Sequence, residues 1–109
     1  MTRPARSLYP KTQLQATALG GRLKAARLRR RMTEAELASR VLVSRPTIRR
    51  LEDGDLRVST AVLVRVLEVL SLEDDLDKIA ANDELGHRLA DARSPRGYRR
   101  KDASLADAL

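Results

Sequence analysis

The chain has 109 residues and a formal net charge of +7, which suits one small domain with a polyanionic partner. It contains no cysteine, which excludes a disulfide framework and a thiolate metal site. No apolar run is long enough for a membrane span or a signal peptide, so we expect a cytoplasmic, nucleoid-associated protein, although the charge alone would suit RNA or an anionic membrane equally well.

Residues 1–33 are basic throughout, with nine cations and no acid. Residues 1–12 hold two prolines and no apolar periodicity, so we expect a flexible basic arm that either contacts a polyanion or has no role. From Gln13 onward, apolar residues follow helical spacing in part, but the pair Gly20 and Gly21 weakens the early turns. A firm helix is therefore expected from about Gly21 to Arg30.

The next expected helix begins after Thr33 with a capping box. The Thr33 hydroxyl can accept a hydrogen bond from the N–H of Glu36, whose carboxylate can accept one from the N–H of Thr33. Leu37 and Val41 are four residues apart and should pack inward, while Glu34 faces water. This spacing predicts a short amphipathic helix.

A second helix should follow after a tight turn. Ser44 can cap its first N–H groups, and Pro46 fits the first turn, where its missing N–H costs nothing. Ile48 and Leu51 are three residues apart and should point inward, and Gly54 can end the helix because it tolerates positive φ. The opposite, exposed face then carries three arginines: Arg45, Arg49 and Arg50.

An exposed helix with arginines in its N-terminal half has the shape and charge to enter the major groove of DNA. There an arginine can donate hydrogen bonds to both O6 and N7 of guanine. A solvated surface helix is the alternative, because many such helices carry arginines. The combination of two caps, a tight turn, inward apolar residues and a cationic face favours DNA.

These residues resemble the helix-turn-helix of the Cro/phage-repressor (XRE) family over roughly residues 19–72. The resemblance rests on three short patterns: Thr33-x-Ala35-x-Leu37-Ala38, Val41-x-Val43-Ser44 and Ile48-x-x-Leu51-Glu52-x-Gly54. It implies an all-α, lambda-repressor-like domain of five helices over residues 13–81, a C-terminal helix over 82–92 and flexible basic ends. Members of the family place the second helix of the motif, the recognition helix, in the major groove.

Within this family pattern, Arg45, Arg49 and Arg50 are the expected base-edge contacts. Ser44 and Pro46 are expected to shape the start of the recognition helix where it meets the bases. All five residues belong to the predicted base-contacting set.

Phosphate contacts are expected from the helix start at Thr33, from Arg31 and from Arg57. For Arg57, a solvated loop arginine is an equal alternative. The resemblance also implies an ion pair between Arg27 and Glu52 that ties the first helix to the recognition helix. Breaking a half-buried pair from one side is costly, so this pair would fix the pitch of the recognition helix.

The chain departs from the family pattern at two positions. Glu34 stands where the family usually has Gln, and its carboxylate would repel a phosphate, although it could orient Arg45 instead. Leu42 stands in the turn where the family usually has Gly, so either Leu42 adopts positive φ or the turn takes another form.

The C-terminal half should be helical and acidic. Ser59 can cap a long helix ending near Leu70, and Ser71 with Asp74 predicts a capping box that opens a short acidic helix. Asn82 or Asp83 can cap a final helix over 84–92, and residues 93–109 have the composition of a flexible basic tail. The acids between residues 68 and 91 should face away from DNA.

No pattern in the sequence predicts an enzyme, a cofactor or a metal site. The lone His87 has no second histidine or paired carboxylates around it, so a surface imidazole is expected. The acids over residues 73–77 are expected to form a solvated face.

The sequence therefore predicts a transcriptional repressor that binds a two-fold symmetric operator as a homodimer. Its small size and C-terminal extension resemble HipB-like antitoxins, which hold a HipA-type kinase toxin and repress the promoter they share. In that case the acidic helices would contact the toxin; otherwise they form the dimer interface or face solvent. The alternatives are a stand-alone XRE-type regulator and a protein that binds RNA or the nucleoid without sequence preference.

Overall fold

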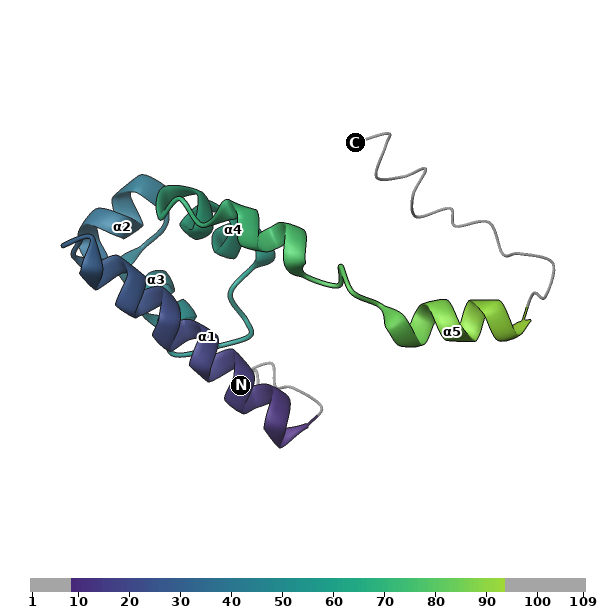
Figure 1. Ribbon diagram of the computed structural model, residues 1–109. Helices are drawn as coiled ribbons and strands as arrows, with labels where there is room; N and C mark the ends of the chain where they lie inside the picture. Colours follow the sequence, from purple (N-terminus) through teal and green to yellow (C-terminus); the bar gives the residue numbers. More distant parts are fainter. Residues whose placement is uncertain (1–8, 94–109) are drawn as a thin grey trace. The chain divides into compact units, whose positions relative to one another are not determined.

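The computed structural model describes residues 9–93; most of the expected arm and all of the expected tail except Arg93 lie outside these residues. All regular structure in this range is helical, which confirms the all-α expectation (Figure 1). The helices are α1 (Pro10–Arg29), α2 (Glu34–Val41), α3 (Arg45–Glu52), α4 (Thr60–Val69), the 3-10 helix η1 (Glu73–Lys78) and α5 (Glu84–Arg93). Within residues 9–93, none of them combines the length and apolar character that crossing a bilayer requires.

Helix α1 begins much earlier than the expected start near Gly21, so that prediction was wrong, as was the end of the arm at residue 12. Pro10 lies in the first turn, and the side-chain Nε2 of Gln13 donates to the carbonyl of Gly54 at 3.2 Å. Gly20 is buried, and a Cβ there would overlap the carbonyl of Glu52. The missing side chain therefore permits close packing of α1 on α3 and does not end the helix.

The caps of α2 and α3 are those that the sequence predicted. The Thr33 hydroxyl accepts from the N–H of Glu36 at 3.0 Å, and the Glu36 carboxylate accepts from the N–H of Thr33 at 3.3 Å. The Ser44 hydroxyl accepts from the N–H of Thr47 at 3.3 Å. Both helices have eight residues and are short, so these caps satisfy N–H groups that would otherwise face solvent.

The turn between α2 and α3 keeps the left-handed conformation that the family usually gives to glycine. Leu42 has φ 66° and ψ 44°, and 82% of its surface is exposed. The N–H of Leu42 donates to the carbonyl of Ser39 at 3.3 Å, and the N–H of Val43 donates to that of Ala38 at 3.0 Å. These two bonds form a Schellman motif, and they hold Leu42 in a conformation that costs about 1–2 kcal/mol for a residue with a Cβ.

The apolar core lies among α1 to α4. Helix α3 packs against α1 and α2, and α2 also packs against α4. Ile48 of α3 is completely buried, which fixes the side of α3 that faces inward. The buried apolar residues are Leu23, Ala26, Met32, Leu37, Ala38, Val41, Ile48, Val62, Val66, Leu67 and Leu70.

The segment after α4 differs from the predicted acidic α-helix. Ser71 has φ 59°, which is not the extended conformation of a capping residue. Its N–H donates to the carbonyl of Glu68 at 3.0 Å, and the N–H of Leu72 donates to that of Leu67 at 2.8 Å. Ser71 therefore closes α4 in a second Schellman motif, and the following helix, η1, is a 3-10 helix.

The chain divides into two compact units, Met1–Asp77 and Lys78–Leu109. In the second unit, Asp83 caps α5 by accepting from the N–H of Gly86 at 3.0 Å, which resolves the choice between Asn82 and Asp83. Leu85 and Leu89 lie four residues apart on α5 and remain 61% and 51% exposed.

Candidate nucleic-acid interface

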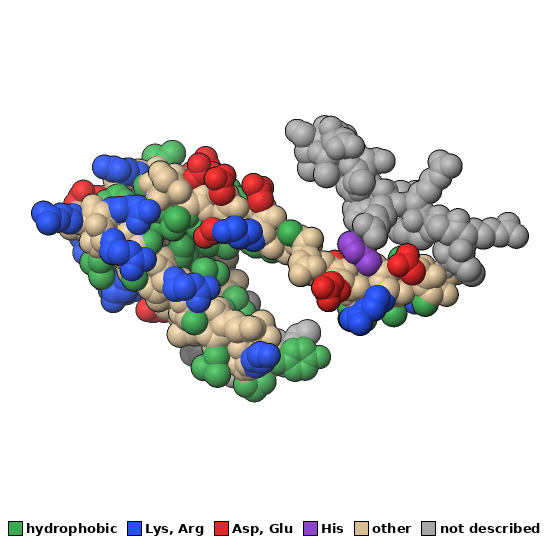
Figure 2. Space-filling model, in the orientation of Figure 1, with side chains coloured by type: hydrophobic (Ala, Val, Ile, Leu, Met, Phe, Trp, Pro, Cys, Tyr) green, Lys and Arg blue, Asp and Glu red, His purple; other side chains and the backbone are tan. Residues whose placement is uncertain are grey.

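Helix α3 presents its arginines to solvent. Arg45, Arg49 and Arg50 are all exposed, whereas Ile48 on the inward side is completely buried. Figure 2 shows many basic side chains over α1 to α3 and several acidic ones over α4 and the segment after it. The exposed, cationic face of α3 is thus the face that the sequence predicted.

A buried ion pair holds α3 against α1. Arg27 Nε donates to Glu52 Oε2 at 2.8 Å and its Nη2 donates to Oε1 at 3.0 Å, while its Nη1 donates to the carbonyl of Met32 at 2.9 Å. The two residues are only 4% and 7% exposed. The hydrogen bonds that Arg27 donates to Glu52 raise the pKa of Arg27; burial lowers it, and the charges of Glu52 and Glu34 raise it by smaller amounts. This is the pair that the family resemblance implied.

Glu34 makes an ion pair with the recognition helix, but with a different arginine from the one expected. Its Oε2 lies 3.1 Å from Arg49 Nη2, whereas the sequence had offered Arg45 as the residue that Glu34 could orient. Arg49 is four residues beyond Arg45 and therefore one turn along the same face of α3. From there its guanidinium can reach the first turn of α2, where Glu34 lies.

Arg57 follows α3 and is paired with a neighbouring acid. Its Nη2 lies 2.7 Å from Asp55 Oδ2, and its backbone N–H donates to Oδ1 at 2.9 Å. The side-chain hydrogen bond and then the backbone one lower the pKa of Asp55 from 3.8 to about 2. Any stability from this carboxylate is therefore present above about pH 4 and is lost as the pH falls through about 2. At neutral pH the charge of Arg57 is compensated, and a phosphate would compete with Asp55 for it.

Arg31 and Thr33, the other predicted phosphate contacts, differ in exposure and in the hydrogen bonds they already make. Arg31 is exposed and has φ 55°. The capping box uses both the N–H and the hydroxyl of Thr33: the N–H donates to the Glu36 carboxylate, and the hydroxyl accepts from the N–H of Glu36. A phosphate at this position would therefore compete with these two bonds.

Sequence reasoning missed Thr47. Its Oγ1 lies 2.9 Å from the Ser44 hydroxyl and accepts from Arg50 Nη2 at 3.3 Å. Ser44, Thr47 and Arg50 follow one another at intervals of three residues, and this spacing on an exposed helical face was the signal available. Thr47 restrains the guanidinium of Arg50 on the exposed face of α3.

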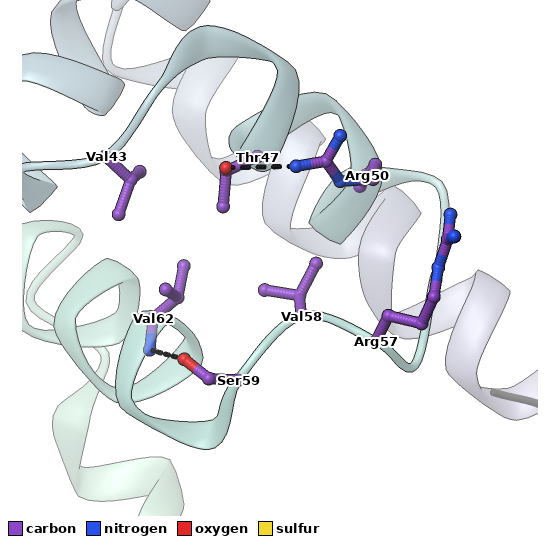
Figure 3. A pocket seen from close by; sticks show the side chains of 7 residues that line it. All are labelled: Val43, Thr47, Arg50, Arg57, Val58, Ser59 and Val62. Atoms are coloured by element: carbon purple, nitrogen blue, oxygen red, sulfur yellow. Dashed lines mark hydrogen bonds between the residues drawn. The ribbon is translucent and has the colours of Figure 1, made fainter. Parts of the chain in front are cut away.

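A hollow of about 470 Å³ lies beside the recognition helix, between α3 and the start of α4 (Figure 3). Val43, Val58 and Val62 point into it and form an apolar floor. Arg50 and Arg57 stand at its edge, so the hollow belongs to the same cationic surface. Within residues 9–93, no group of three or more His, Cys, Asp or Glu side chains could hold a metal ion.

Comparison with known proteins agrees with this geometry. A family model described as a helix-turn-helix domain matches residues 18–78, which is more than half of the chain and includes all of α2, α3 and α4. No curated protein matches the sequence. The matched range contains every residue of the candidate surface, from Arg27 to Arg57. The chain therefore belongs to the helix-turn-helix family, as a DNA-binding transcriptional regulator of the XRE type.

Proposed function

We propose that this protein is a sequence-specific repressor that binds a two-fold symmetric operator as a homodimer. The observation that carries the proposal is the exposed face of α3, whose three arginines stand on a helix seated by the Arg27–Glu52 pair. Because this buried pair holds α3 in one position on α1, the arginines keep a constant geometry relative to one another. Sequence discrimination requires such a geometry, whereas general attraction to phosphates does not.

The proposed base contacts come from the exposed side of α3. Arg45, Arg49 and Arg50 donate to base edges, with guanine as the preferred base, and Ser44 and Pro46 shape the first turn where it meets them. Arg31, Thr33 and Arg57 flank this side in the sequence and are the proposed phosphate contacts, which position the protein without selecting a sequence.

The length of α3 supports a dimer. Its eight residues span about 12 Å, which covers only three or four base pairs. Two copies related by two-fold symmetry would read two such sites about 34 Å apart, one in each successive major groove. A dimer thus supplies the discrimination that one short helix lacks.

For the biological role, we propose the HipB-like antitoxin of a HipA-type kinase toxin. The support is the acidic composition of residues 68–91, which contain eight acids and only two cations, Lys78 and Arg88. Such a segment is unsuited to phosphates and suits a basic protein surface. Purification from the native host would bring down a kinase encoded beside this gene, whereas a stand-alone regulator would purify as a homodimer only.

Arg45→Ala tests the base-contact proposal. After selection of a preferred duplex from a random pool, we expect the variant to bind that duplex about 5–150-fold more weakly, because a bidentate base contact is worth about 1–3 kcal/mol. Discrimination at one base pair of each half-site should also relax. Fluorescence anisotropy on the selected and a shuffled duplex measures both effects.

Arg40→Ala is the matched control, since it removes the same charge from an exposed position on α2 that is outside the proposed contacts. The affinity of this variant for both duplexes should fall slightly and to a similar extent. If Arg45→Ala lowered the affinity for the selected and the shuffled duplex by the same factor, the assignment of Arg45 to a base contact would be refuted.

A further inference from the structure

Glu34 is an acid at the edge of a surface otherwise proposed to bind DNA. It is the first residue of α2, and its side chain is 27% exposed. Its carboxylate pairs with Arg49 of the recognition helix at 3.1 Å, while the Arg49 side chain remains 62% exposed. A carboxylate in the first turn of a helix is favoured by the helix dipole, so an acid at this position suits the start of α2.

The ion pair with Glu34 reduces the contribution of Arg49 to non-specific DNA affinity. General affinity for a duplex comes from cations that neutralise phosphates. The charge of Arg49 is already compensated by Glu34, and an approaching phosphate is repelled by the carboxylate. Binding without a matching base therefore gains little from Arg49.

The same pair leaves Arg49 suited to a base. A guanidinium has five N–H donors, and the bond to Glu34 uses only one of the two on Nη2. The bond restricts the directions open to the remaining donors, so a guanine in their path is bound with less loss of side-chain freedom. We propose that Glu34 is a specificity-determining residue, which orients Arg49 toward a guanine and weakens binding to DNA that lacks it. This inference rests on the proposed function of α3 as a sequence-reading helix.

The Asp55–Arg57 pair provides a matched comparison in the same unit of the fold. Asp55 also compensates an exposed arginine, with 2.7 Å between Oδ2 and Nη2. Arg57 is proposed to contact phosphate, and phosphate contacts carry no sequence information. Asp55→Asn should therefore strengthen binding to every duplex by the same factor, which separates a general charge effect from a specific one.

The test compares wild type, Glu34→Gln and Asp55→Asn as full-length proteins on the selected and the shuffled duplex. We expect Glu34→Gln to bind the shuffled duplex several-fold more tightly without binding the selected one more tightly, so that the ratio of the two affinities falls at least several-fold. Sites selected anew by Glu34→Gln should lose one preferred guanine, the same one that Arg49→Ala loses. Adding Glu34→Gln to Arg49→Ala should leave the ratio unchanged, since both act through one contact.

Glu34→Asp separates the two parts of the proposal, because it keeps the charge and shortens the side chain. It should bind random DNA as weakly as wild type and still lose part of the preference for guanine. Glu34→Gln could instead raise the affinity for both duplexes by the same factor, as Asp55→Asn should. In that case the specificity role is wrong, and Glu34 is only a surface charge. A wild type that binds both duplexes equally would overturn the proposed function, and this inference with it.

Discussion

Arg27→Ala is expected to lower the free energy of unfolding by about 3–5 kcal/mol. The change leaves the Glu52 carboxylate buried without its partner, since Glu52 is only 7% exposed, and it also removes the donor to the carbonyl of Met32. Small domains have total stabilities of about 5–15 kcal/mol, so a large part of the stability would be lost. Urea denaturation followed by circular dichroism measures the effect.

Two further variants show whether the loss comes from the unpaired buried charge. Arg49→Ala breaks the exposed pair with Glu34 and should cost less than about 1 kcal/mol, because exposed ion pairs contribute little. Replacing both buried partners, Arg27→Met with Glu52→Leu, should recover much of the stability lost by Arg27→Ala, because no buried charge remains unpaired. A loss below about 1 kcal/mol for Arg27→Ala would show that the pair does not hold α1 and α3 together.

Gly20→Ala is expected to destabilise the protein, whereas Gly21→Ala should stabilise it. A Cβ at Gly20 would overlap the backbone carbonyl of Glu52 and lie 2.8 Å from that of Leu51. Backbone atoms cannot rotate aside as a side chain can, so α3 must move away from α1. We expect a cost of about 1–3 kcal/mol or more from this overpacking, measured by urea denaturation.

Gly21 is the matched control for this prediction. It lies in the same helix, and a Cβ there would meet nothing within 4 Å. Alanine should therefore add about 0.5–1 kcal/mol through its greater helix propensity. If the two variants changed stability alike, the close approach of α1 and α3 at Gly20 would not be a constraint.

The parts of the fold predicted correctly depend on interactions within a few residues. The capping residues Thr33, Ser44 and Ser59 each accept from an N–H three residues ahead, so sequence spacing alone determines their geometry. The inward position of Ile48 likewise follows from helical periodicity.

The errors concern positions whose conformation is determined by distant parts of the chain. Local propensity predicts a break at Gly20, but the approach of Glu52 makes a missing side chain necessary there. Serine is a preferred N-cap residue, but the hydrogen bonds that end α4 hold Ser71 in the left-handed conformation that usually belongs to glycine. The partner of Glu34 depends on how α2 and α3 cross, which residue spacing within one helix does not specify.

The candidate site depends both on local sequence spacing and on contacts between distant parts of the chain. The exposed arginines of α3 follow from periodicity, whereas the Arg27–Glu52 pair was expected only from the family resemblance, because 25 residues separate its members. Which arginine contacts which base remains a prediction, since specificity depends on the DNA as much as on the protein.

Contact between duplex DNA and the exposed face of α3 can be observed residue by residue. The measurement is a titration of the ¹⁵N-labelled protein with its selected duplex, followed through the backbone amide resonances. We expect the largest chemical-shift changes on residues 44–50, apart from Pro46, which has no backbone N–H, with smaller ones at the start of α2 and near Arg57. Shifts concentrated on α4 and η1, with those of residues 44–50 unchanged, would contradict DNA contact through the exposed face of α3.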